Sequence, residues 1–212
     1  MSAKWEATYA AKSETERSWT QPLPAESLAF ITDAGAPLDG PIIDIGGGAS
    51  RLVDELLARQ HTDITVLDIS AAALAEARGR ISEPVAEANV HWIVADLAEW
   101  TPQRGYAVWH DRAVFHFLVE PDDQEAYVAA ASEGVVEGGS LILATFAPAG
   151  PEQCSGLPVR RWSADQLAAR FAEHFELVKS AVISHTTPWG STQPFTWVLL
   201  RRRGTSVGRA TT

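Results

Sequence analysis

The residues best suited to chemistry are three aspartates and a glycine-rich run. The segment from Asp44 to Gly48 contains three consecutive glycines after an apolar run, and Asp68 and Asp96 each end a later apolar run. Glycine lets a chain turn sharply and lets a ligand approach the backbone amides closely. Such amides hold carboxylates or phosphates, whereas carboxylates accept hydrogen bonds from hydroxyl or amino groups. These residue types therefore predict a site for a nucleoside-containing cofactor.

Alternating strands and helices are predicted to position these residues. Short apolar runs rich in β-branched residues alternate with segments of helical periodicity, a pattern typical of βαβ units and a parallel sheet. Ser70 can cap the second of the helices, and Gly138 and Gly139 are expected to stop the third. The expected strands are 42–45, 64–68, 90–95, 106–110 and 140–146, and the expected helices are 49–60, 71–79 and 124–136.

The pattern changes after residue 146. A loop over 147–158 is followed by a helix from a Ser163 cap to Phe171. Two further strands, 175–184 and 194–203, have no helix between them and should pair antiparallel. The predicted fold is a Rossmann-like three-layer α/β sandwich with a mostly parallel seven-stranded sheet and a C-terminal antiparallel hairpin. Two helices, about 3–16 and 25–34, are expected before the first strand.

Composition excludes several classes of function. The formal net charge is −10, which disfavours nucleic acid as a partner. No apolar run approaches the roughly 20 residues that span a bilayer, and no signal-peptide core is visible, so we expect a cytoplasmic protein without a membrane partner. Cys154 is the only cysteine, and no histidine–carboxylate spacing indicates a metal. A monomer or a homodimer is expected.

The spacing of the acids narrows the choice of cofactor. Asp68 follows Gly48 by 20 residues, a position from which a carboxylate accepts hydrogen bonds from ribose hydroxyls. Asp96 can accept a hydrogen bond from an adenine amino group, and the backbone N–H of Leu97 can donate to the adenine ring. All of these groups should lie at the carboxyl edge of the sheet, where such folds bind ligands.

At this point the chain resembles the class I S-adenosylmethionine-dependent methyltransferase family, in particular its type 11 and type 12 members. That family has an acid, a Gly-x-Gly-x-Gly run, acids after the next two strands and a closing antiparallel hairpin; here Ser50 replaces the third glycine. The resemblance covers roughly residues 40 to 203. It implies S-adenosylmethionine as cofactor and S-adenosylhomocysteine as product. The cofactor-binding residues that it implies are Asp44, Gly46, Gly48, Asp68, Ile69, Asp96, Leu97 and His110.

The segment after the fourth strand should lie beside the methyl donor. Residues 108–118 resemble bacterial methyltransferases of uncertain substrate, and Asp111-Arg112-Ala113 resembles the Trp-Asp-Arg-Gly run of thiopurine-type methyltransferases. Asp111 and His116 are the predicted catalytic residues. His116 has the ordinary pKa range of a general base, and Asp111 can accept a hydrogen bond from an acceptor amine. Both also suit purely structural roles.

Trp19 lies just before the core and is predicted to cover the cofactor, since an aromatic face is favourable near a sulfonium. The expected organisation is a helical lid segment over 1–40, a cofactor-binding methyltransferase domain over 41–203 and a flexible tail over 204–212. The alternative for Trp19 is ordinary packing of an added helix onto the sheet.

The predicted function is methyl transfer to a small-molecule acceptor. A protein lysine is the alternative acceptor, and an NAD(P)-dependent oxidoreductase is the alternative from another class. The dinucleotide fingerprint requires glycine where this chain has Arg51, and no Gly-Lys-Ser or Gly-Lys-Thr run indicates a phosphate-binding P-loop. A scaffold that has lost activity is a third possibility, which the three aspartates disfavour.

Overall fold

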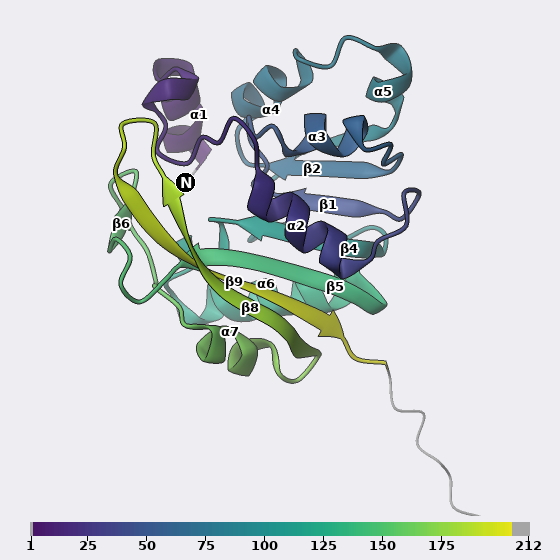
Figure 1. Cartoon of the computed structure of the whole chain (residues 1–212), viewed down its shortest axis with the longest axis vertical. Coiled ribbons are helices and arrows are strands. Elements are labelled where there is room, and N and C mark those ends of the chain that lie inside the picture. Colours follow the sequence, from purple (N-terminus) through teal and green to yellow (C-terminus); the bar gives the residue numbers. More distant parts are fainter. Residues whose placement is uncertain (1, 205–212) are drawn as a thin grey trace, which may run out of the picture.

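A computed structural model describes residues 2–204 of the 212-residue chain. Its main feature is a seven-stranded sheet with the order β3-β2-β1-β4-β5-β9-β8, whose strands are drawn as arrows in Figure 1. The predicted fold class is confirmed. The strands of this sheet are β1 Ile42–Ile45, β2 Ile64–Asp68, β3 Val90–Val94, β4 Tyr106–Arg112, β5 Val135–Phe146, β8 Phe175–Thr186 and β9 Thr192–Arg202.

The first five strands run parallel, and the last two form the predicted antiparallel hairpin. In β1, Asp44 is in register with Val66 of β2 and His110 of β4. β9 pairs antiparallel with both β5 and β8, so β8 is the edge strand. The parallel order places the carboxyl ends of β1 to β4 along one edge, which is where the fold leaves room for a ligand.

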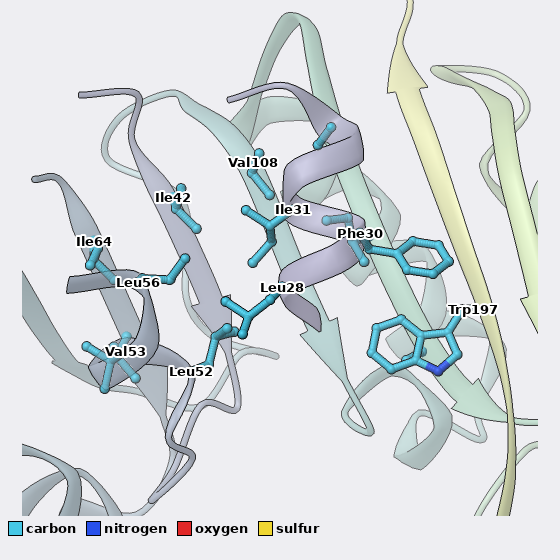
Figure 2. Close-up of a cluster of buried hydrophobic side chains, with 14 of the residues drawn as sticks. Leu28, Phe30, Ile31, Ile42, Leu52, Val53, Leu56, Ile64, Val108 and Trp197 are labelled. Atoms are coloured by element: carbon cyan, nitrogen blue, oxygen red, sulfur yellow. The ribbon is translucent and has the colours of Figure 1, made fainter. Parts of the chain in front are cut away.

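Helices cover both faces of the sheet. Apolar side chains of α2, α3 and α4 pack with one cluster of buried residues, and those of α6 and α7 pack with the other. Figure 2 shows the first cluster, in which Phe30 of α2 lies against Trp197 of β9, with ring centroids 5.1 Å apart. The helices are α1 Ser2–Ala11, α2 Ala25–Ala34, α3 Leu52–Ala58, α4 Ala71–Arg78, α5 Pro84–Ala88, α6 Pro121–Gly134 and α7 Ala164–Phe171.

The helix caps follow the sequence. The Ser70 hydroxyl accepts a hydrogen bond from the Ala73 N–H at the start of α4, as predicted. At α7, Ser163 and Gln166 form a reciprocal capping box. Each cap satisfies backbone N–H groups that have no partner within the helix.

The boundary between α6 and β5 differs from the prediction. The helix was expected to run to residue 136 and stop at Gly138, but it ends at Gly134 and β5 begins at Val135. A Cβ on Gly134 would lie 2.6 Å from Cζ3 of Trp109, so the helix approaches the sheet closely there. Gly138 has a φ of +72° inside β5, which glycine adopts readily. The glycine pair therefore shapes the strand and does not end the helix.

Several short elements escaped the sequence prediction. The first helix ends at Ala11, and a separate 3₁₀ helix, η1 Glu14–Glu16, follows it. The other unpredicted elements are α5, the 3₁₀ helix η2 Phe115–Phe117, and a two-stranded hairpin of β6 Gln153–Cys154 and β7 Leu157–Pro158. Within residues 2–204 no helix has the length and apolar character needed to cross a bilayer. The predicted tail lies, apart from Gly204, outside the described residues.

Candidate functional site

Two adjoining cavities lie at the carboxyl edge of the sheet. The larger has a volume of about 250 Å³, and the smaller about 60 Å³. The two cavities adjoin one another, because both are lined by Tyr9, Trp19, Gly46 and Arg112. Of the predicted cofactor residues, those that line one or both cavities are Trp19, Asp44, Gly46, Asp68, Ile69, Asp96, Leu97 and His110.

The loop after β1 requires its glycines. Gly46 has a φ of +63° and Gly48 a φ of +50°, both in the left-handed region that disfavours other residues. A Cβ on Gly46 would lie 2.1 Å from a methyl carbon of Val114, and one on Gly48 would lie 2.4 Å from the Tyr9 hydroxyl. Gly46 lines both cavities. Gly48 lies next to the Tyr9 hydroxyl and lines neither cavity.

Asp68 presents a buried carboxylate at the end of β2. Burial raises its pKa to about 6, and the charge of Asp44 adds to the rise. Hydrogen bonds from backbone amides of Ser70, Gly48 and Ile69 act in the opposite direction, and the Ser70 N–H donates to Oδ1 at 2.8 Å. A buried carboxylate without a cation is stabilised when a ligand donates hydrogen bonds to it. Asp68 is therefore suited to a diol.

Asp96 and Leu97 form the far wall of the larger cavity. The Asp96 Oδ1 accepts a hydrogen bond from the Ala98 N–H at 3.1 Å, which fixes the turn after β3. The turn places Leu97 beside Asp96 on the cavity surface, together with Leu118 from the segment after β4. The result is an apolar slot with an acid at its rim, a suitable environment for a flat heterocycle with an exocyclic amine.

Asp44 and His110 form a buried pair between the first and fourth strands. Asp44 Oδ1 and His110 Nδ1 lie 2.7 Å apart, and the side chains are only 6% and 3% exposed. The His110 Nε2 is buried and has no partner among residues 2–204. Both residues line the smaller cavity, so the unpartnered nitrogen is a candidate contact for a polar ligand group.

The N-terminal segment covers both cavities. The Trp19 ring packs against Trp5 and Tyr9, with centroids 5.7 and 6.0 Å apart. The segment is tied to α4, because the Glu6 carboxylate accepts a hydrogen bond from the Ser70 hydroxyl at 2.7 Å. Arg17 forms an ion pair with Glu76 at 2.7 Å.

Tyr9 lines both cavities; the sequence makes it a weaker candidate for the lid than Trp19 and does not place it among the cofactor-binding residues. Burial raises the pKa of its hydroxyl, and the charge of Asp68 raises it further. The tyrosine therefore stays neutral and can donate a hydrogen bond. Its position in a helix four residues after Trp5 was the only sequence signal, because one helical turn separates the two rings.

Asp111 does not reach either cavity. It is completely buried on the face covered by α6, where the Tyr127 hydroxyl donates to Oδ2 at 2.7 Å. The backbone N–H groups of Val114 and Phe115 donate to the same carboxylate at 2.9 and 3.1 Å. Burial raises its pKa to about 6. Successive residues of a strand face opposite sides, so Asp111 faces away from the cavities, and the catalytic role expected of it stays a prediction.

His116 also lies away from both cavities. It is completely buried among Phe117, Phe146 and Phe195, and the Phe146 N–H donates to its Nδ1 at 3.4 Å. Burial lowers its pKa to about 3, and the nearby Arg112 charge acts in the same direction. A histidine whose pKa lies so far below neutrality is a weak base, which disfavours the general-base role expected of His116; that role stays a prediction.

The segment between these two residues nevertheless shapes the site. Ala113 has a φ of +73° and lines the larger cavity. It stands where the thiopurine-type motif has glycine, the residue that adopts this conformation most easily. The turn sends Val114 and Phe117 into the cavity wall beside Cys154 of β6. Residues adjacent to the predicted catalytic pair, and not the pair itself, therefore contact the cavity.

Comparison with known proteins shows similarity to methyltransferases in sequence and in fold. Residues 42–139 match a family model described as a methyltransferase domain. Trans-aconitate 2-methyltransferase of Sinorhizobium medicae is 32% identical over 117 residues, which are 55% of this chain and 41% of that protein. The match therefore spans less than half of the curated relative.

Solved structures share the fold across nearly the whole chain. A structure from a study of disulfide-to-thioacetal conversion in echinomycin biosynthesis has a TM-score of 0.73 at 21% identity, with coverage of 97% of this chain and 94% of that one. The 1,6-didemethyltoxoflavin-N1-methyltransferase of Burkholderia thailandensis, solved with 1,6-didemethyltoxoflavin and S-adenosylhomocysteine, has a TM-score of 0.70 at 17% identity. Coverage is 96% of this chain and 87% of that one.

The strand order and the closing antiparallel hairpin define a Rossmann-like fold of the methyltransferase type. The sequence of residues 42–139 is thus similar to a methyltransferase domain, and the fold of the chain is similar to that of solved methyltransferases.

The first prediction concerns Asp111. We expect Asp111→Ala to lower the free energy of unfolding by about 2–4 kcal/mol, because it leaves a buried hydroxyl and two amides without an acceptor. Tyr127→Phe removes one of these hydrogen bonds and should cost about 1 kcal/mol. Urea denaturation measures both changes. A fully stable Asp111→Ala protein that binds cofactor but has no activity would show that the residue is catalytic.

The second prediction concerns the pH dependence that His116 produces. The unfolded chain protonates this imidazole near pH 6.5, whereas the native protein does so only near pH 3. The stability from neutral His116 is therefore complete above pH 6.5 and decreases as the pH falls towards 3. Thermal unfolding at pH 7.5 and pH 5 should show a smaller loss for His116→Asn than for the wild type.

The raised pKa values of Asp68 and Asp111 act in the opposite direction, but they are common to both proteins and cancel in this comparison. His91→Asn is the matched control, because its imidazole is 57% exposed. An equal pH response of the wild type and His116→Asn would contradict the assigned environment of His116.

Proposed function

We propose that this chain transfers a methyl group from S-adenosylmethionine to a small molecule and releases S-adenosylhomocysteine. The observation that carries the proposal is that Asp44, Asp68 and Asp96 end adjacent parallel strands and line connected cavities at one edge of the sheet. The family match and the methyltransferase relatives support it. The cofactor assignment is also supported by the toxoflavin-type methyltransferase of the same fold, which was solved with S-adenosylhomocysteine.

The residues present fit the proposed cofactor. The Asp68 carboxylate would accept hydrogen bonds from the ribose hydroxyls, and burial raises its pKa although backbone amides already donate to it. The unpartnered Nε2 of His110 offers a polar contact in the smaller cavity, where the resemblance places the methionine end of the cofactor. Asp96 and Leu97 would hold the adenine in the apolar slot.

When bound, the cofactor supplies an electrophilic methyl group on a sulfonium. The chain itself supplies alignment and exclusion of water, which account for much of the catalysis in a displacement of this kind. The loop that contains Gly46 would let the cofactor approach the backbone at the strand ends. Trp19 and Tyr9 close the site from above, since they line both cavities. Asp111 and His116 are not assigned a proton-transfer step.

A small molecule fits the site better than a protein side chain does. The larger cavity is partly open, is lined in part by the N-terminal helix and has aromatic walls from Trp5, Trp19 and Phe117. A preformed, largely apolar cavity with a few polar groups is typical of small-molecule sites. Relatives whose names give trans-aconitate and 1,6-didemethyltoxoflavin as acceptors support the same class. Residues 1–40 are accordingly proposed to act as the lid of a methyltransferase domain over 41–203.

Calorimetric titration with S-adenosylhomocysteine and with NAD tests the cofactor. We expect heat of binding for the first compound only. Binding of NAD alone would favour an oxidoreductase instead. A screen of small-molecule acceptors that measures S-adenosylhomocysteine release then tests the reaction, with a mixture of lysine-containing peptides as the comparison arm for the protein-acceptor alternative.

The third prediction tests the ribose contact. The free protein holds Asp68 protonated below about pH 6, whereas a diol binds best to the ionised carboxylate. The affinity for S-adenosylhomocysteine should therefore be constant above pH 6 and fall by up to about tenfold per pH unit below it. Asp68→Ala should weaken binding by at least about 30-fold at pH 7.5 and abolish this pH dependence. Isothermal titration calorimetry measures both effects.

The exposed Asp39 provides the control, since Asp39→Ala should leave both the affinity and its pH dependence unchanged. If Asp68→Ala binds S-adenosylhomocysteine as tightly as the wild type, Asp68 does not hold the ribose.

A further inference from the structure

Arg112 lies at the end of β4 on the same side of the sheet as His110. Arg112 lines both cavities. Nη1 donates a hydrogen bond to the carbonyl oxygen of Trp19 at 3.0 Å, and the guanidinium carbon lies 5.2 Å from the centre of the Phe195 ring. These two contacts hold the flat guanidinium in one orientation at the junction of the cavities.

The charge of Arg112 has no ion-pair partner. Its Nη2 is buried and unpartnered among residues 2–204, and no carboxylate of the described chain forms an ion pair with it. Glu26 and Asp44 act on it only through space. Burial lowers its pKa to about 10, so the side chain stays charged at neutral pH. An isolated buried cation is costly, and the cost is relieved when an anion binds beside it.

The other arginines of the smaller cavity are different. Arg17 forms an ion pair with Glu76 at 2.7 Å, and Arg51 forms one with Glu14 at 3.0 Å. Their guanidinium groups are thus neutralised by the chain itself. Of these three cavity-lining arginines, Arg112 is the one with a charge and an N–H group left for a ligand.

The position of Arg112 in the sheet indicates which ligand that is. Asp68 and Asp96 follow β2 and β3, on one side of β1, and they are assigned to the adenosine of the cofactor. Arg112 belongs to β4 on the other side of β1, and its neighbours are Phe195 of β9 and Cys154 of β6. The methyl acceptor must approach from this second half, because the adenosine occupies the first.

We propose that Arg112 binds a carboxylate of the methyl acceptor, so that the substrates of this protein are small carboxylic acids. This inference rests on the proposed methyltransferase function. A guanidinium offers two parallel N–H donors to a carboxylate, a geometry that lysine cannot reproduce. The carboxylate also needs no general base to become an anion at neutral pH, which agrees with a cavity from which His116 is excluded.

The fourth prediction tests this inference on the complete chain with S-adenosylhomocysteine bound. Trans-aconitate, citrate, succinate and benzoate serve as carboxylate probes, and the corresponding primary amides serve as neutral counterparts. We expect at least one acid to bind the wild-type complex and its amide to bind at least about 30-fold more weakly. Arg112→Met should weaken binding of that acid by about 100-fold, which corresponds to the loss of a buried charge pair, and leave the amide unaffected. Calorimetry measures each dissociation constant.

Arg112→Lys and Arg161→Met complete the set. Arg112→Lys keeps the charge without the paired donors and should give an intermediate affinity. Arg161 is paired with Glu152 on the surface, and its replacement should change nothing. Circular dichroism and binding of S-adenosylhomocysteine by Arg112→Met establish that the variant is folded.

The outcomes separate this inference from the proposed function. A wild-type protein that does not bind S-adenosylhomocysteine contradicts the proposed function itself. If it binds that compound but binds no acid of the panel in an Arg112-dependent manner, only the carboxylate inference is overturned. The inference also fails if Arg112→Met weakens S-adenosylhomocysteine about 100-fold but leaves 5′-methylthioadenosine unaffected, because the carboxylate would then be that of the cofactor.

Discussion

The side chains of Asp44 and His110 meet across β1 and β4, and the site depends on this buried contact. The two residues are direct neighbours in the parallel register, and their 2.7 Å separation fixes both side chains at the floor of the smaller cavity. A buried carboxylate requires hydrogen-bonding partners, and a slip of one strand by one residue would turn its member of the pair to the opposite face. The pair forms only when β1 and β4 are in this register, so the alignment of the two strands fixes the position of these side chains in the smaller cavity.

The N-terminal segment and the ends of the strands together line the two cavities. Glu6 binds the start of α4, and Arg17 binds Glu76 farther along the same helix. These contacts place Trp19 and Tyr9 above the glycine loop, and the Trp19 carbonyl in turn holds Arg112. These hydrogen bonds and ion pairs therefore link the proposed lid, the proposed cofactor site and the proposed acceptor contact. In Figure 1 the same segment, α1, lies at the end of the molecule where the tip of the β8–β9 hairpin also lies.

The predicted catalytic residues show where reasoning from the sequence stops. Asp111 and Arg112 are adjacent, but neighbouring positions of a strand face opposite sides of the sheet. Asp111 therefore serves the Tyr127 network under α6, and Arg112 reaches the cavities. The sequence alone does not indicate which face of the sheet the cavities lie on. His116 follows in a 3₁₀ turn that buries it, and this short element has no clear signature in the sequence.

The succession of strands along the chain, the closing hairpin, the glycine turn and the three aspartates were determined by the sequence, because apolar periodicity and residue type report on local structure. Tertiary packing decided the rest: the end of α6 against Trp109, the burial of His116, the lid role of Tyr9 and the unpaired charge of Arg112. Burial and pairing depend on residues far apart in the chain. Which side chains are buried and which are paired is fixed only when the helices and strands have packed together.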